Sequence, residues 1–189
     1  MMSPKIRFKK SDDSDYQDWQ QKKLGDFLSI PVKEEVVVTS TNELLTVKLH
    51  NGGIKQAEEK ALQFGSTKYY KRYAGQFIYG IQNFHNGAMG IIPNALDGKC
   101  SSAFIPSFDI HDIDTSFFDM YVSRPSYYIP KEKYAVGNGS KLIHEKELFE
   151  FDIAVASDIE EQTKIANFVS EIDNLIASAE HEVESTKRL

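Results

Sequence analysis

Residues 157–189 read SDIEEQTKIANFVSEIDNLIASAEHEVESTKRL, and their apolar side chains recur at spacings typical of a helix. Successive apolar positions are separated by 4, 3, 4, 3 and 4 residues, which is the seam of a coiled coil: Ile165, Val169, Ile172, Ile176, Ala179 and Val183. No Pro or Gly interrupts these 33 residues, so a continuous helix would be roughly 48 Å long. Ser157 and Glu160 have the spacing of a capping box, which predicts a helix start at Ser157.

A helix of this length leaves two arrangements open. Phe168 and Leu175 form a second apolar line beside the seam, and this edge is suited to contact with the chain's own globular domain. The helix can fold wholly onto that domain, or its seam along Val169, Ile176 and Val183 can pack against a second helix.

Composition predicts one globular domain with an appendage. The chain has 189 residues, of which 41% are hydrophobic and 12% aromatic, enough for one substantial core. A single cysteine, Cys100, excludes an intrachain disulfide framework and a multi-cysteine zinc site, and it suits a reducing compartment. Neither a signal peptide nor a long apolar run is visible, so we expect a soluble, cytoplasmic protein that does not contact membranes.

The net charge of −6 is unevenly distributed along the chain. Residues 157–189 hold 8 acidic and 3 basic side chains, a net charge of −5, which leaves 19 basic and 20 acidic side chains for residues 1–156. Residues 44–96 are basic, with a net charge of +4. A basic surface suited to an anionic partner is therefore expected on the globular part, despite the acidic total.

The middle of the chain has a residue pattern typical of an antiparallel sheet. Short apolar runs alternate with turns, such as Asn51-Gly52-Gly53, and predict strands within these ranges: 36–41, 44–49, 77–81, 89–92, 101–110 and 119–129. Residues 24–28 and 144–149 have helical spacing, and Trp19 is expected to lie in the core. The predicted fold class is α+β: a mainly antiparallel β domain with short helices, followed by one long C-terminal coiled-coil helix.

Motifs of known catalytic sites are absent from the sequence. It contains no phosphate-binding loop, GxSxG elbow, HExxH helix or Asn-Pro-Pro-Tyr type tetrapeptide, so we expect a protein that is not an enzyme. His111, Asp112 and Asp114 have metal-ligating side chains, but a loop rich in Asp is more often solvated, and we predict no metal site there.

The stretch GSTKYYKRYAG, residues 65–75, has the residue types of a nucleic-acid surface. Basic side chains suit phosphates and tyrosines supply planar contacts, and the residues concerned are Lys68, Tyr69, Tyr70, Lys71 and Arg72. Asn83, His85 and Asn86 follow in a polar loop and can both donate and accept hydrogen bonds, as reading base edges requires. Lys141, in the loop GNGSK, is a further candidate phosphate contact. The alternative is a tyrosine-rich strand with a solvated, charged face.

Several segments together resemble the DNA-specificity subunit of type I restriction–modification enzymes, in a half-size form. They lie in that family's order over nearly the whole chain: PKIRF (4–8), Trp19, KLG (23–25), GQFIYGIQNFHNGAMGIIP (75–93), SSAFIPSF (101–108), GNGSKLI (137–143) and EEQTKIANFVSEIDNLI (160–176). The last of these is the most specific. The family commonly has Pro where Ser157 stands.

The resemblance implies an N-terminal arm at 1–19, a target recognition domain at 20–156 and a conserved spacer helix at 157–189. Such a chain would bind double-stranded DNA, read half of a split target and dock methyltransferase and restriction subunits. S-adenosylmethionine, ATP and Mg²⁺ would belong to those partners, and this chain would carry no cofactor. A homodimer through the helix seam would supply two recognition domains.

Two rival interpretations remain at this point. The chain could be an interaction module, a truncated specificity subunit that keeps the helix without productive DNA recognition. An enzyme that acts on nucleic acid is the second rival, and the absent motifs argue against it. The DNA target cannot be derived from the sequence, because one scaffold presents different base contacts in different proteins.

Overall fold

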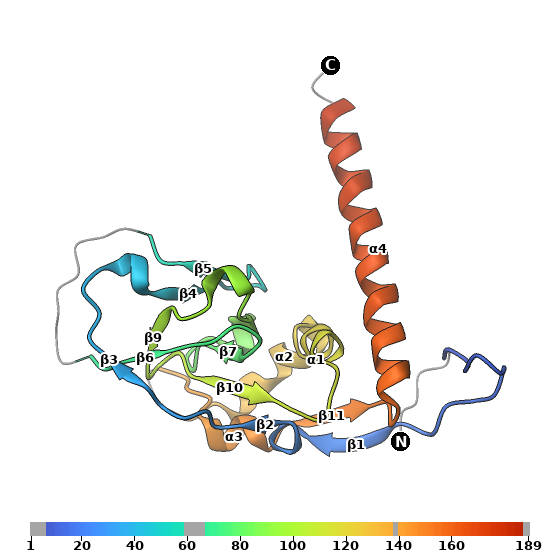
Figure 1. The fold of residues 1–189 in the computed structure, drawn as a ribbon, viewed down its shortest axis with the longest axis horizontal. Coiled ribbons are helices and arrows are strands. Elements are labelled where there is room, and N and C mark those ends of the chain that lie inside the picture. Colours follow the sequence, from blue (N-terminus) through green and yellow to red (C-terminus); the bar gives the residue numbers. More distant parts are fainter. Residues whose placement is uncertain (1–6, 59–66, 138–139, 187–189) are drawn as a thin grey trace. The chain divides into compact units, whose positions relative to one another are not determined.

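The computed structural model describes residues 7–58, 67–137 and 140–186 (Figure 1). The chain divides into two compact units. One, the arm–helix unit, consists of Met1–Gln21 and Ala154–Leu189, and the other, the sheet domain, is Lys22–Ile153.

Short antiparallel strands make up the sheet domain. Among the described residues, a four-stranded sheet has the order β2 (Leu28–Ser29), β10 (Ser107–Ile110), β7 (Phe77–Tyr79) and β8 (Met89–Ile91). A three-stranded sheet has the order β3 (Glu35–Val36), β6 (Tyr69–Lys71) and β9 (Cys100–Ser102). β4 (Leu45–Val47) and β5 (Ile54–Gln56) form a hairpin, and β1 (Gln20–Lys23) pairs with β11 (Asp152–Val155).

Large aromatic side chains fill the core of the sheet domain. Phe77 and Tyr79 of β7 are fully buried, as is Phe108 of β10. The Phe77 ring meets that of Phe118 edge-on at 5.2 Å, and the Tyr79 ring stacks on that of Phe108 at 6.1 Å. The Tyr79 hydroxyl donates to the Ile143 carbonyl at 3.0 Å, which satisfies its polar atom, and burial raises the pKa of this phenol.

The β4–β5 hairpin is held by its apolar face. Leu45 packs with Ile78 and Ile92 in one cluster, and Val47 and Ile54 lie against it. The turn expected at Asn51-Gly52-Gly53 closes this hairpin, with Val47 paired to Ile54. The hairpin tip therefore has a fixed position on the sheet domain.

The strands expected at 44–49, 77–81 and 89–92 are confirmed, each shorter than its apolar run. The range 101–110 holds parts of two strands, β9 and β10, and the range 36–41 is a strand only at Val36. One strand prediction is wrong, because residues 119–129 are mainly helical: α1 is Thr115–Val122 and α2 is Pro125–Tyr128. An Asp114 carboxylate oxygen accepts from the Phe117 amide at 2.8 Å and caps α1, which buries Phe117 and Val122 on one face. Pro125 takes the first position of α2, where its missing amide hydrogen costs nothing.

Short helices and turns link the strands. The helix expected at 144–149 is confirmed as α3 (Glu145–Phe149), whereas the helical spacing at 24–28 produces a single 3-10 turn. The 3-10 turns are Leu24–Asp26, Thr41–Glu43, Phe84–Asn86, Asn94–Leu96 and Ile129–Tyr134. With these helices and the sheets, the predicted α+β class is confirmed.

The long C-terminal helix is confirmed as α4 (Ile159–Thr186). It begins two residues after the predicted start, because Ser157 and Glu160 have other partners. The Ser157 hydroxyl donates to the Asp18 carbonyl at 2.6 Å, and Glu160 forms an ion pair with Lys164 at 2.8 Å. Trp19 is buried, as expected. Among the described residues, neither α4 nor any shorter helix is long and apolar enough to cross a membrane.

Candidate nucleic-acid interface and partner helix

The two lysines of the predicted phosphate surface flank or end β6, and both have acidic partners. Lys68 Nζ donates to Glu35 Oε2 at 2.9 Å, and Lys71 Nζ donates to Glu34 Oε1 at 3.4 Å. Both partners lie beside β6 because β3 pairs with it, Glu35 opposite Tyr70. The Tyr73 hydroxyl and Lys71 hold the pKa of the Glu34 carboxyl below its usual value, so this carboxylate stays charged at neutral pH. The basic charge of this strand is therefore locally matched.

The third basic residue, Arg72, lies inside the sheet domain and is 4% exposed. Its Nε donates to the Ser101 hydroxyl at 2.7 Å, and its Nη2 lies 3.3 Å from the Ile105 carbonyl. Burial lowers the pKa of this guanidinium to about 10, since its hydrogen-bond acceptors among the described residues are hydroxyl and carbonyl oxygens and not carboxylates. In this position Arg72 ties the end of β6 to β9, to β10 and to the segment between them. Its neighbours Tyr69 and Tyr70 are half-buried.

The three predicted base-reading residues lie together in the turn after β7. Asn86 Nδ2 donates to Asn83 Oδ1 at 3.1 Å and lies 3.5 Å from His85 Nε2. All three side chains are half-buried. His85 Nδ1 is buried and has no hydrogen-bond partner among the described residues.

Lys141 is exposed and forms an ion pair with Glu132. Its neighbours Asn138 and Gly139 in the predicted GNGSK loop lie outside the described residues, as do residues 65 and 66 of the GSTKYYKRYAG stretch. The pairing lowers the pKa of the Glu132 carboxyl, so it holds at neutral pH.

A second polar surface, which the sequence did not indicate, lies at the tip of the β4–β5 hairpin. Asn51 Nδ2 donates to the Ser123 carbonyl at 2.5 Å, which joins the tip to the end of α1. The His50 amide donates to the Asn86 carbonyl at 2.8 Å, which joins the same tip to the predicted base-reading turn. Arg124 follows Ser123 and is exposed. Three segments that are distant in sequence thus meet through hydrogen bonds.

Metal binding receives no support from the described ranges, in which no group of three His, Cys, Asp or Glu side chains is arranged to hold an ion. His111 Nδ1 and Asp112 Oδ2 lie 3.0 Å apart and form an exposed pair.

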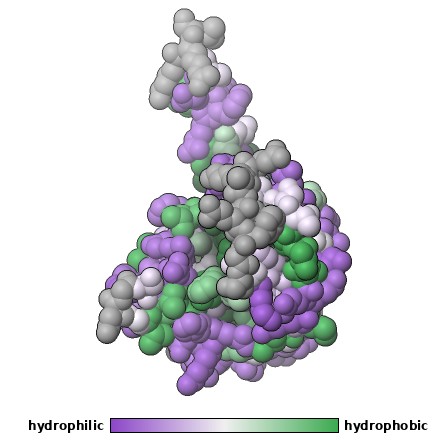
Figure 2. All heavy atoms as spheres, turned by 90° about the vertical axis from the view of Figure 1, so that its left-hand side faces the viewer, coloured by the Kyte–Doolittle hydropathy of each residue, from purple (hydrophilic) through white to green (hydrophobic). Residues whose placement is uncertain are grey.

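The face of the molecule drawn in Figure 2 carries hydrophobic and hydrophilic side chains interspersed with one another. Scattered apolar side chains are normal on a folded surface and do not by themselves mark an interface.

The first turns of α4 pack against the N-terminal arm. Arg7 Nε and Nη2 donate to the two carboxylate oxygens of Glu161 at 3.0 and 2.9 Å, and the Glu161 side chain is fully buried. Lys164 Nζ donates to the Tyr16 hydroxyl at 2.7 Å, and the Phe8 ring meets that of Phe168 edge-on at 5.6 Å. The bidentate geometry fixes the arm on this end of the helix.

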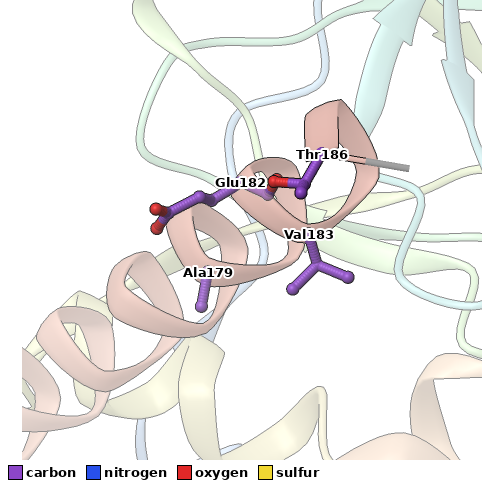
Figure 3. Close-up of a pocket in the computed structure, with 4 residues that line it drawn as sticks. All are labelled: Ala179, Glu182, Val183 and Thr186. Atoms are coloured by element: carbon purple, nitrogen blue, oxygen red, sulfur yellow. The ribbon is translucent and has the colours of Figure 1, made fainter. Parts of the chain in front are cut away.

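Beyond these turns the predicted seam is open. Ile165 and Val169 are half-buried, whereas Ile172, Ile176 and Val183 are 38%, 51% and 54% exposed. Ala179 is also exposed, and Figure 3 shows it on the same side of α4 as Val183. A shallow groove along this side is lined by residues of α4 alone: Ile176, Ala179, Glu180, Val183 and Glu184. The apolar side chains that the heptad pattern predicts to be covered are thus available to a partner.

No protein-family model matches the sequence, and no curated protein sequence matches it significantly. Solved structures do match the fold. The HsdS subunit from Thermoanaerobacter tengcongensis superposes with a TM-score of 0.64 at 15% identity, over 86% of this chain and 44% of that one. The S subunit of a type I restriction–modification system from M. genitalium gives 0.59 at 18% identity, over 100% of this chain and 46% of that one.

The chain has the fold of about half a type I S subunit. A chain from a type I R-M system, solved to explain complex assembly and conformational transition, agrees: its TM-score is 0.62 at 11% identity, over 90% of this chain and 46% of that one. The resemblance predicted from the sequence is confirmed for the fold. The chain spans about half the length of the S-subunit structures it matches. At sequence identities of 11–18%, the roles of single side chains are argued from the contacts within this chain.

Proposed function

We propose that this protein is a non-catalytic half-subunit of a type I restriction–modification system that recognises one half of a bipartite DNA target. The observation that carries the proposal is the match of 86–100% of this chain to 44–46% of S-subunit structures. A sheet domain followed by one long helix is what half of such a fold contains. In this proposal the sheet domain binds double-stranded DNA and α4 binds protein partners.

Two copies of the chain would complete the missing half. The open seam from Ile172 to Val183 supports this arrangement, because an antiparallel pair of α4 helices buries the same side chains on both copies. Such a pair also directs the two sheet domains to opposite ends, as a split, symmetric target requires. Each fully buried aliphatic side chain contributes roughly 1.5–3 kcal/mol, and association entropy offsets much of the sum. We therefore expect dimers at micromolar concentration.

The charge of α4 supports the proposal that it binds protein partners and that the sheet domain binds DNA. Residues 157–189 carry a net charge of −5, so α4 repels DNA unless protein covers it. We propose that methyltransferase and restriction subunits dock there, in the cytoplasm, and supply S-adenosylmethionine, ATP and Mg²⁺. Adding the methyltransferase subunit should tighten DNA binding by at least about tenfold, because one half-site offers few contacts.

Lys68 and Lys71, at the two ends of β6, distinguish DNA recognition from the main alternative, an interaction module without DNA recognition. Lys68 and Lys71 are matched by Glu35 and Glu34, which favours an interaction module that does not bind DNA through this strand. If the lysines exchange these partners for phosphates, replacing both by Ala should reduce the salt slope of DNA binding by about 0.9 per charge. An unchanged slope would remove β6 from the interface.

The proposed function is tested by selecting duplexes from a random-sequence pool, with the full chain and its host's methyltransferase subunit together. The expected result is enrichment of a split motif. Binding without any sequence preference would contradict the proposal and favour the interaction module. Cleavage of the pool by the chain alone, with Mg²⁺ added, would contradict its non-catalytic role.

A further inference from the structure

The tip of the β4–β5 hairpin is held in the left-handed backbone conformation that tight hairpin turns require. His50 and Asn51 have φ values of 55° and 54°, in the left-handed region, although neither is glycine. Two backbone hydrogen bonds hold them there: the His50 amide donates to the Asn86 carbonyl at 2.8 Å and the Asn51 amide to the Gly87 carbonyl at 2.9 Å. These two bonds and the hairpin pairing give the tip a fixed backbone position.

Arg124 stands beside this tip. The Asn51 side chain donates to the carbonyl of Ser123, the residue before Arg124, at 2.5 Å. We call the hairpin tip, residues 48–53, together with Ser123 and Arg124 the tip–corner surface. His50, Asn51 and Arg124 are all exposed, and Leu49 is 46% exposed.

The Arg124 guanidinium is already oriented. Its carbon Cζ lies 3.9 Å from the centroid of the Tyr121 ring, and its Nε donates to the Tyr121 carbonyl at 3.1 Å. The Tyr121 ring is itself held edge-on against the Tyr127 ring at 5.3 Å. Stacking and the Nε bond restrict the side chain, so that the two terminal nitrogens Nη1 and Nη2 remain to donate to a ligand.

The charge of this surface differs from that of β6. Within the described parts of the chain, Arg124 and Lys48 form no ion pair, whereas Lys68 and Lys71 each have a glutamate. An unmatched, oriented guanidinium binds an acceptor without first losing a carboxylate partner.

We propose that the tip–corner surface reads base edges of duplex DNA, with Arg124 donating two parallel hydrogen bonds to O6 and N7 of a guanine. This inference rests on the proposed function and assigns its specificity to residues that the sequence did not indicate. The fork of a guanidinium matches the paired acceptors of guanine. His50 and Asn51 offer hydrogen-bonding groups to a neighbouring base pair, and Leu49 offers an apolar contact suited to the methyl group of thymine.

The test compares Arg124→Ala and Arg124→Lys with the wild-type chain in selection from a random duplex pool, with the methyltransferase subunit present. The Arg124→Ala motif should match that of the wild type except at one G·C pair, where the preference disappears. Affinity for the wild-type motif should fall roughly 5- to 150-fold. Arg124→Lys should restore the preference only in part, because an ammonium can reach O6 and N7 of guanine but lacks the oriented, planar fork.

Lys133→Ala is the matched control. Lys133 is an exposed cation of the same domain whose Nζ lies 4.8 Å from the Tyr134 ring centroid, and its removal should leave the motif unchanged. An unchanged motif in Arg124→Ala would overturn the inference and leave the proposed function standing. Equal weakening of all duplexes would also overturn it, since that is the behaviour of a phosphate contact.

If the wild-type chain enriches no motif, the proposed function fails and this inference fails with it. Thermal unfolding establishes whether each variant is folded. If Arg124→Ala does not fold, His50→Ala tests the same surface. The inference predicts that this variant loses its preference at one base pair, and an unchanged motif would overturn it.

Discussion

The two ends of α4 share one heptad pattern but differ in what covers them. Near the start, Glu161 and Gln162 are buried and the arm packs on this end through Arg7. From residue 170 onward every described side chain is exposed, including Ile176 and Val183. Within the described part of the arm–helix unit, an apolar seam that is uniform in sequence is therefore covered at one end and exposed at the other. The other end is where a second protein chain is expected.

The largest effect on the covered end should follow from Arg7→Ala. This change leaves the fully buried Glu161 carboxylate without its bidentate partner, and an uncompensated buried charge costs roughly 3–5 kcal/mol. The arm should detach, and amide hydrogen exchange in the first turns of α4 should accelerate accordingly. Amides beyond residue 172 should exchange as before.

Lys9→Ala is the control for this variant. Lys9 also belongs to the arm, but its ion pair with Asp15 is exposed on both sides and should contribute less than about 1 kcal/mol. Equal acceleration in the two variants would show that the Arg7–Glu161 pair does not hold the arm.

A smaller effect is expected from Phe8→Ala. The Phe8 ring is half-buried and meets Phe168 edge-on, so its loss should weaken the covered end by about 1 kcal/mol beyond the lost apolar area. Hydrogen exchange should accelerate at the same amides as in Arg7→Ala, but less. Unchanged exchange would mean that the ring contact does not stabilise this end.

The smallest effect concerns the exposed pair at the edge of the covered end. Hydrogen bonds from Lys164 and then Tyr16 lower the pKa of the Glu160 carboxyl. A carboxyl whose pKa is lowered in the folded state stabilises the fold at pH values above its ordinary pKa. This stability is lost as the pH falls through the pKa of the folded state. Lys164→Met should therefore raise the Glu160 pKa towards its ordinary value, as an NMR titration of the carboxyl carbon would show. A pKa that does not move would assign the shift to Tyr16.

Local patterns in the sequence predicted the elements that depend on local physics. The spacing from Ile165 to Val183 predicted α4, and Asn51-Gly52-Gly53 predicted the hairpin turn. The strand predicted at 119–129 is helical because the Asp114 cap and Pro125 outweigh the β-like composition of this stretch. Both helix-start signals, Asp114 before α1 and Pro125 at the start of α2, are visible in the sequence.

The candidate site was harder to predict, because its properties arise from contacts between distant residues. Arg72 can be buried because Ser101 and Ser107, which are 29 and 35 residues away in the sequence, accept its hydrogen bonds. The charge of Lys68 is paired with that of Glu35 through a strand pairing that the sequence does not reveal. The roles predicted in DNA binding stay predictions for all nine residues: Lys68, Tyr69, Tyr70, Lys71, Arg72, Asn83, His85, Asn86 and Lys141.

Sedimentation equilibrium is the most direct test that the open end of α4 pairs two copies of the chain. The wild-type chain should dimerise at micromolar concentration. Ile176→Glu combined with Val183→Glu should give a folded monomer, because both side chains are more than half exposed in the single chain. Asn174→Glu adds a charge on the opposite side of the helix, roughly half a turn from Ile176, and should leave the dimer intact. A wild-type chain that remains monomeric at high concentration, or a double variant that still dimerises, would contradict the account.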